Sequence, residues 1–310
     1  MSLLGALFGV TNVAQTLRMS VPYVCAGLGG VWSERSGVPN IALEGILLAG
    51  ALGGVVTNLA TGNPWVGATA GALLGAVIGA IHALIVVRGR VDAILVGVAI
   101  NLVAAGGARF VLRVLYESSS NSPPVGGFRT SPSGGTGGLT LLSRTLADPL
   151  LLATLALTVW TSWAIARTRF GLRVRACGED PAAAAAAGVD VARVRVAAVS
   201  LGSAIAGLGG VALAYDQHQF QSGMSGGRGF IALAAVILSG WRPAGTAAAC
   251  VAFAALDAAQ IVVQQQQRSA ADWVQALPYA ATLLALWVLA KGRGSGPMGG
   301  RAPAGLGKGV

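Results

Sequence analysis

Polar side chains interrupt the apolar stretches of this sequence, and the chemistry they could provide is hydrogen bonding to a polar solute. Ionisable groups in hydrocarbon cost several kcal/mol to bury, so each is a candidate functional residue. Hydrogen bonding between neighbouring helices is an equally good use for them. We favour Asn40 and Glu44, within SGVPNIALEGILLAG (residues 36–50), as residues that line a path. The full set of candidates is Asn40, Glu44, His82, Asn101, Arg228, Asp257 and Gln260.

A second pattern lies in residues 169–196, RFGLRVRACGEDPAAAAAAGVDVARVRV. Asp180 can cap a helix, Pro181 suits its first position, six alanines follow, and Gly188 suits the C-terminal stop. The pattern predicts a short helix whose smooth alanine face has little core to bury. Such a helix lies on the membrane surface or docks into a partner's groove; a connector without a partner is the remaining alternative. The flanking arginines could bind lipid phosphates or acids on that partner.

Other chemistries have no support in the sequence. The GLGG strings at 27–30 and 207–210 are not preceded by a strand, so we do not read them as nucleotide sites. They more plausibly let helices approach closely. There is no G-x-x-x-x-G-K-[ST] loop, so the chain cannot hydrolyse ATP by that route. Three scattered cysteines indicate neither disulfides nor a metal site. We therefore expect no enzyme activity, metal or cofactor.

The composition predicts which elements position these residues. Of 310 residues, 54% are hydrophobic and 10% are charged, against about 25% charged in soluble domains. The mean hydropathy is +0.69. We expect an all-α polytopic transmembrane bundle of about eight to ten segments. Asp92 is expected to cap the segment that follows it. The apolar segments are 10–32, 40–60, 65–87, 92–115, 148–166, 196–215, 229–240, 243–263 and 272–290.

The distribution of basic residues predicts the orientation. If the segments alternate with the link 167–195 in the cytoplasm, the cytoplasmic links hold 14 Lys and Arg residues and the external links four. The N-terminus then lies outside, and no cleavable signal is evident in it. The net charge of +10 thus marks the cytoplasmic face rather than a nucleic-acid site. We expect one domain over 1–291, an external loop over 116–147 that is flexible at 117–138, and a disordered cytoplasmic tail over 292–310.

Two blocks of sequence recur in the same order. AGLGGV occurs at 26–31 and 206–211, and residues 40–50 match 230–240 at five of eleven positions. The copies, about 10–115 and 196–290, start five segments apart, so they would face opposite ways across the membrane. Inverted repeats of this kind suit transporters. The segment 229–240 is about half a bilayer long, which predicts a broken helix. A helix N-terminus carries a partial positive charge, which gives Glu44, an acid early in a helix, a physical reason to be there.

These blocks carry a family resemblance. GLRVRACGEDPAAAAAAGVD, AGLGG, GRGFIALAAVILSGW and SERSGVPNIALEG resemble the bacterial ABC-transporter permeases for simple sugars and nucleosides, which are related to ribose and branched-chain amino-acid permeases. The likeness covers about residues 15–290 and is greatest to the nucleoside permeases. It implies a bacterial inner-membrane importer with a second permease as heterodimer partner, a cytosolic ATP-binding subunit and an external substrate-binding lipoprotein. It also implies that ATPase coupling rests on Gly178, Glu179, Asp180, Pro181, Ala184 and Gly188.

Two other classes of transporter remain open at this point. A secondary transporter working alone, driven by an ion or proton gradient, would also suit inverted repeats and intramembrane Glu44 and Asp257. A passive channel would never take solute above equilibrium. The alanine helix favours the ABC permease, because a lone transporter needs no docking element. The long Gly/Ser-rich loop 117–138 departs from the family pattern and leaves docking of the binding protein undefined.

Overall fold

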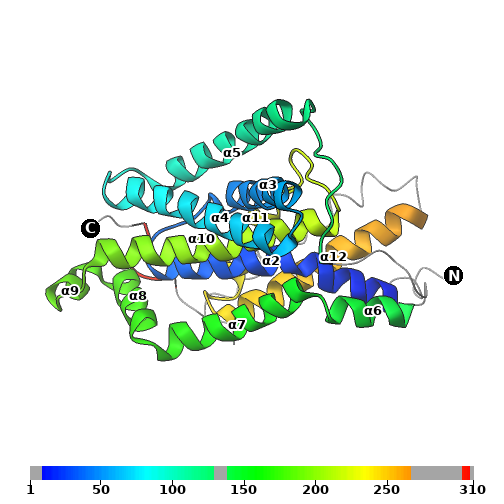
Figure 1. Ribbon diagram of the computed structural model, residues 1–310. Helices are drawn as coiled ribbons and strands as arrows, with labels where there is room; N and C mark the ends of the chain where they lie inside the picture. The colour runs from blue at the N-terminus through cyan, green and yellow to red at the C-terminus, as the bar shows by residue number, and fades with distance from the viewer. Residues whose placement is uncertain (1–8, 129–137, 267–301, 308–310) are drawn as a thin grey trace.

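The computed structural model describes residues 9–128, 138–266 and 302–307, whose secondary structure is helical apart from an isolated bridge between Asn121 and Gln221 (Figure 1). The all-α prediction is therefore confirmed for these residues. The predicted segment 272–290 lies outside them. The helices are α2 (Val10–Arg35), α3 (Leu43–Thr61), α4 (Pro64–Val87), α5 (Ala93–Tyr116), α6 (Gly138–Leu146), α7 (Pro149–Arg167), α8 (Arg169–Glu179), α9 (Pro181–Ala186), α10 (Val191–Asp216), α11 (Arg228–Leu238) and α12 (Pro243–Gln266).

Local sequence chemistry starts several of these helices. Asp92 caps α5 as predicted, since its Oδ1 accepts hydrogen bonds from the backbone N–H groups of Ile94 and Leu95 at 2.9 and 3.0 Å. Asn63 and Asp148 cap α4 and α7 in the same way, each followed by proline at the first helical position. Helix boundaries therefore follow short signals in the chain.

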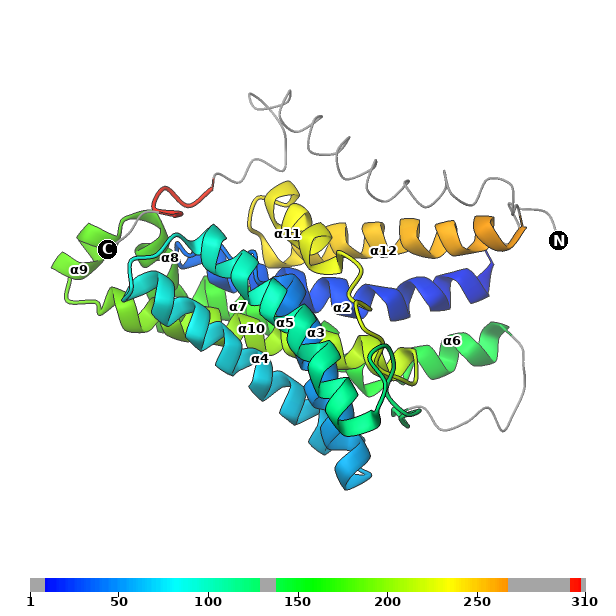
Figure 2. The ribbon, with the colours of Figure 1, turned by 90° about the horizontal axis from the view of Figure 1, so that it is seen from above.

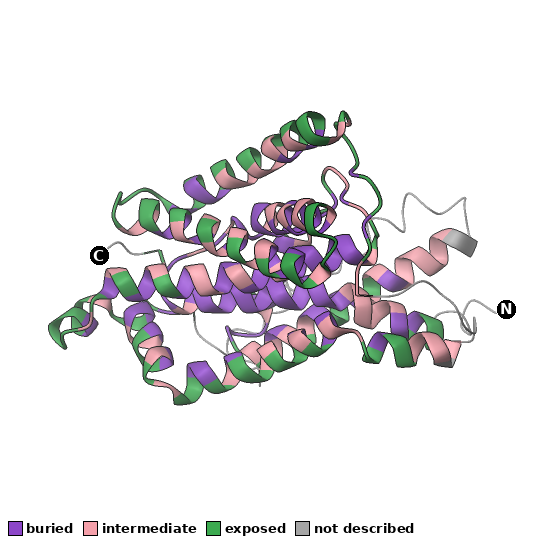
Figure 3. Cartoon of the chain, viewed as in Figure 1, coloured by how far each residue is buried: buried purple, intermediate pink, exposed green. Residues whose placement is uncertain are grey.

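The centre of the bundle is formed by α2 and α10, which run side by side (Figures 1 and 2). Helix α10 packs against α4, α2 and α3, and α2 also packs against α12. Most residues of the two central helices are buried, whereas α4, α5 and α7 present many exposed residues (Figure 3). The repeated glycine strings lie in α2 and α10. A Cβ on Gly29 would lie 2.5 Å from the carbonyl oxygen of Gly202, so these glycines permit close helix packing.

Six of the described helices are long and apolar enough to cross a membrane: α3, α4, α5, α7, α10 and α12. Their outward faces carry large hydrophobic side chains. On α5, Leu102, Val103 and Phe110 are 70%, 73% and 69% exposed. Such a surface suits hydrocarbon rather than water. The chain is a multi-pass membrane protein.

The links between helices gather at two ends of the bundle. At one end, here called the basic end, Arg195 donates hydrogen bonds to the carbonyl oxygens of Ser36 and Cys177, and Arg35 donates to that of Trp241. At the other end, here called the distal end, Arg109 donates to Ser222 Oγ, and Asn58 donates to the carbonyl oxygen of Gly126. The links predicted to share one side of the membrane therefore converge.

The distal end is more ordered than the sequence predicts. Residues 120–125 pair with 218–222 through backbone hydrogen bonds, and α6 lies within the loop predicted over 116–147. Phe128 contacts Trp65 and Tyr215, with ring centroids 4.5 and 5.7 Å apart. The prediction of flexibility is wrong for residues 117–128, because aromatic packing and backbone pairing outweigh their Gly/Pro/Ser composition.

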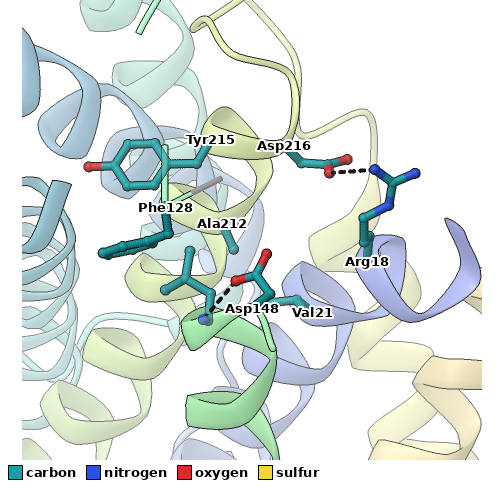
Figure 4. Close-up of a pocket in the computed structure, with 8 residues that line it drawn as sticks. Arg18, Val21, Phe128, Asp148, Ala212, Tyr215 and Asp216 are labelled. Atoms are coloured by element: carbon teal, nitrogen blue, oxygen red, sulfur yellow. Dashed lines mark hydrogen bonds and ion pairs between the residues drawn. The ribbon is translucent and has the colours of Figure 1, made fainter. Parts of the chain in front are cut away.

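A small cavity lies among these distal residues (Figure 4). Its walls include Phe128, Tyr215 and Asp148, whose carboxylate caps α7, and the ion pair of Arg18 with Asp216 at 3.9 Å. The cavity volume is only about 20 Å³, which is room for about one water molecule. This cavity is too small for an organic solute.

Candidate functional site

The starts of α3 and α11 meet inside the bundle, and Glu44 joins them. Its Oε1 accepts a hydrogen bond from the backbone N–H of Gly227, and its Oε2 accepts one from Gly229, both at 2.8 Å. A helix N-terminus has unpaired N–H groups and a partial positive charge, so a carboxylate stabilises it. The sequence predicts an acid beside a helix start; the structure shows that the helix is α11, from the other half of the chain.

The close approach depends on glycine at the start of α11. A Cβ on Gly229 would lie 2.5 Å from the backbone nitrogen of Glu44, and Gly227 has a left-handed φ of 83°. Larger residues at these two positions would push the helix starts apart or strain the turn. Neither glycine was a candidate from the sequence; the signal was the run GGRG before an apolar segment.

A charged cluster follows directly on this junction. Arg228 pairs with Asp257 of α12 at 3.2 Å, and the same Asp257 oxygen accepts a hydrogen bond from the Tyr23 hydroxyl at 3.1 Å. The Arg228 guanidinium lies 5.7 Å from the centroid of the Tyr23 ring. The Arg228 and Asp257 side chains remain 18% and 19% exposed, so neither is completely buried by the described residues. Tyr23 was missed because nothing in its sequence context distinguishes it from a core residue.

Two predicted residues, Asn40 and Asn101, hold the link between α2 and α3. Asn101 donates to the carbonyl oxygen of Ile41 at 3.0 Å and accepts from the backbone N–H of Gly45 at 2.8 Å. Asn40 is fully buried and donates to Ser33 Oγ at 3.1 Å, while its Oδ1 has no hydrogen-bond partner among the described residues. Asn101 therefore holds the backbone of the α2–α3 link in place through both the nitrogen and the oxygen of its side-chain amide. Asn40 retains one side-chain oxygen, Oδ1, that could still accept a hydrogen bond.

The two remaining candidates, His82 and Gln260, have no hydrogen bond to this junction among the described residues. His82 is buried in α4, with its Nε2 3.4 Å from the carbonyl oxygen of Ala93. Gln260 is half-buried on α12. The junction of the two helix starts therefore consists of Glu44, Gly227 and Gly229, with Arg228, Asp257 and Tyr23 beside it.

The predicted alanine helix is present as α9 at the basic end. Asp180 Oδ1 accepts from the N–H groups of Ala182 and Ala183, both at 3.0 Å, and Gly188 has a φ of 81° after the helix. Ala184 is buried, and the other alanines of the helix are exposed. An additional helix, α8, precedes it and was not predicted. Thr168 caps α8 by accepting from Gly171 N–H at 3.0 Å.

Arg195 connects this segment to the α2–α3 link. Its side chain is 2% exposed and donates to the carbonyl oxygens of Ser36 at 3.0 Å and Cys177 at 3.3 Å. A second connection joins the start of that link to the end of α11: Trp241 donates its ring N–H to the carboxylate of Glu34.

Burial raises the pKa of the Cys177 thiol above its ordinary value, so this cysteine stays protonated and unreactive.

Arg195 can be tested by a conservative substitution. Arg195→Lys keeps the charge but cannot reach both carbonyl oxygens as the planar guanidinium does. We expect it to destabilise the protein by about 1–3 kcal/mol, the cost of a buried group left unpaired, measured as thermal unfolding in detergent. Arg193→Lys is the matched control, since Arg193 is exposed and its ion pair in the described structure is with Asp190 at the surface. Equal melting temperatures for both variants would contradict the connecting role.

A cavity of about 370 Å³ opens at the basic end. Its volume falls within the range of about 300–1,000 Å³ that is usual for small-molecule sites. It lies between the α2–α3 link, the α4–α5 link and the start of α10. Its lining includes Val38, Pro39, Arg90, Asp92, Arg195 and Gly307.

The architecture agrees with sequence comparisons. Residues 12–286 match the family described as the branched-chain amino acid transport system permease component. The chain belongs to this family. It is an ABC-transporter permease, and members of the family lack an ATPase domain, so the permease is not itself an enzyme.

Several relatives are named for the substrate that they transport. The permease is 34% identical over 251 residues to the guanosine ABC transporter permease protein NupQ of Bacillus subtilis, covering 78% of this chain and 79% of that protein. It is 33% identical over 300 residues to the nucleoside ABC transporter permease protein NupC of Lactococcus lactis, covering 88% of this chain and 90% of that protein. A putative glucose ABC transporter permease protein of Haloferax volcanii is 34% identical over 257 residues, covering 79% and 75%. A second guanosine permease of Bacillus subtilis, NupP, is 25% identical over 264 residues, covering 81% and 74%.

Proposed function

We propose that this chain is the membrane-spanning subunit of a bacterial ABC importer that carries nucleosides inward, with simple sugars as the second choice of substrate. The observation that carries the proposal is the junction at Glu44, where two helix starts meet beside Arg228, Asp257 and Tyr23. Polar groups at interrupted helices inside a bundle suit solute binding in transporters. The similarity to guanosine and nucleoside permeases supports the choice of nucleosides over sugars.

The junction offers contacts that match a nucleoside. Asp257 is an acceptor for ribose hydroxyls, and Arg228 is a donor for carbonyl groups of the base. Outside the junction, in the α2–α3 link, Asn40 has a spare acceptor in its Oδ1. Tyr23 supplies an aromatic ring next to these groups. We assign the binding of substrate in the path to Asn40, Glu44, Arg228 and Asp257, with Asn101 positioning the link.

The helix order supports the proposed inverted repeat. In one half, α2 is followed by a non-helical link and α3; in the other, α10 is followed by a non-helical link and α11. The 11 residues of α11 span about 16 Å, so it crosses only part of a bilayer of about 30 Å. We infer that the two halves rock about the Glu44 junction during alternating access, with the basic end in the cytoplasm.

The assembly needs partners because the chain carries no nucleotide-binding loop. We propose that a cytosolic ATPase docks on the exposed alanines of α9, with Gly178, Glu179, Asp180, Pro181, Ala184 and Gly188 as the coupling residues. The pair of guanosine permeases in one organism supports a heterodimer with a second permease. An external binding lipoprotein would deliver the nucleoside to the distal end, and the outer surface would contact inner-membrane lipid.

Substrate competition and one substitution test this proposal. Labelled guanosine uptake by cells with the full transporter should be inhibited by other nucleosides and not by glucose. Asp257→Asn should raise the half-saturating concentration about tenfold, because it weakens a charged contact at the path. Asp216→Asn, which changes the distal ion pair, is the control and should leave the half-saturating concentration unchanged. Uptake of labelled glucose without uptake of labelled guanosine would make sugars the substrate.

A further inference from the structure

Residues 302–307, here called the C-terminal strap, return to the basic end of the bundle. The sequence predicts disorder over 292–310, yet this part is held by three hydrogen bonds from its backbone. Gly305 N–H donates to the carbonyl oxygen of Gly178 at 2.8 Å, and Gly307 N–H donates to that of Gly37 at 3.0 Å. Ala304 N–H donates to Glu179 Oε2 at 3.3 Å. Figure 2 shows this segment beside α8.

The strap is fitted closely rather than resting on the surface. Pro303 and Gly305 are buried, and Leu306 packs against the main hydrophobic core. A Cβ on Gly305 would lie 2.8 Å from the carbonyl oxygen of Gly178 and 3.1 Å from Pro181 Cδ. A side chain at this position would therefore force the strap off the coupling segment.

The two halves of the strap contact different parts of the transporter. Ala304 and Gly305 bond to the end of α8, immediately before α9. Gly307 bonds to the link that leads into α3 and lines the cavity at the basic end. The strap thus spans from the coupling segment to the wall of that cavity. The hydrogen bonds of the described strap go to Gly37, Gly178 and Glu179 and not to the exposed alanines of α9, so we expect the strap and an ATPase to bind together.

We propose that the C-terminal strap is a coupling latch, which passes movement of the 178–181 segment to the α2–α3 link and the cavity wall. This inference rests on the proposed function, since it needs an ATPase to move that segment. The strap works alongside Arg195, which joins the same two parts through its side chain. Two of the three hydrogen bonds of the strap join backbone groups, so they depend on close approach rather than on charge.

The test uses the complete transporter, purified with its ATPase and reconstituted in liposomes. Gly305→Val should leave the amount of bound ATPase and the rate of ATP hydrolysis unchanged. It should lower the nucleoside taken up per ATP about fivefold or more, the usual size of a coupling between two sites. Ala302→Val is the matched control, since Ala302 is an exposed position in the same strap, and it should behave as the parent. A truncation that removes 302–310 should reproduce the Gly305→Val result.

Three results would overturn the latch. The same uptake per ATP in Gly305→Val, the truncation and the parent would show that the strap does not couple. Loss of bound ATPase from Gly305→Val would make the strap a docking surface, and increased ATPase binding would make it a competitor. A parent that takes up nucleoside without ATP would instead refute the proposed function, so the two failures are distinguishable.

Discussion

Glu44→Gln is expected to lower nucleoside uptake about tenfold or more and to destabilise the junction by about 1–3 kcal/mol. The Glu44 carboxylate accepts from two N–H groups at the start of α11, Gly227 and Gly229. Glutamine has one acceptor oxygen, and its amide group would face the second N–H, which would lose its partner. The start of α11 would then shift, and Arg228 would move with it. Uptake at saturating substrate and thermal unfolding in detergent measure the two effects.

The control for this variant is Glu117→Gln, which makes the same change at an exposed site after α5. It should transport and unfold as the parent does, because no buried N–H group depends on Glu117 in the described part of the chain. If Glu44→Gln transported normally, the junction would be a packing feature and the path would lie elsewhere. A lowered melting temperature with normal uptake would assign Glu44 to stability alone.

The double variant Ala183→Asp/Ala186→Asp is expected to reduce ATP-driven uptake to below about 1% of the parent. Both alanines are exposed on α9, the surface proposed to enter a groove of the ATPase. An unpaired charge buried in an interface costs about 3–5 kcal/mol, which corresponds to more than a hundredfold loss of affinity. Co-purification of the ATPase should be lost together with uptake, while membrane insertion of the permease continues.

A matched control keeps the side chains small and uncharged. Ala183→Ser/Ala186→Ser adds only hydroxyl groups and should retain the ATPase and most of the uptake. A charged variant that still bound the ATPase and transported would contradict the assignment of α9 as the docking element. Surface labelling of both variants in inverted vesicles would check that α9 remains on the cytoplasmic side.

Features that depend on neighbouring residues in the sequence were predictable. Asp180, Pro181 and Gly188 correctly placed α9, because capping and termination are local properties. The length of the segment 229–240 likewise predicted the short helix α11. The apolar runs predicted the six candidate spans for the same reason, but three further predicted segments are not among them. Of these, 10–32 falls within α2, 229–240 corresponds to the short α11, and 272–290 lies outside the described residues.

Features that depend on contacts between residues far apart in the sequence could not be predicted. Glu44 was a candidate, but its partners lie 183 and 185 residues away, so local sequence could not identify the helix start that it caps. The C-terminal strap looked disordered because its composition is Gly-rich and its contacts are long-range backbone hydrogen bonds. Arg195 was read as a flanking charge for lipid or a partner, whereas it is buried between two carbonyl oxygens.

The most direct test of the account follows accumulation of a labelled nucleoside in proteoliposomes that hold the reconstituted transporter. We predict accumulation above the external concentration when ATP reaches the ATPase side, and none when ATP is replaced by a sodium or proton gradient. Accumulation driven by either gradient without ATP would contradict the claim that this permease takes its energy from a partner through α9.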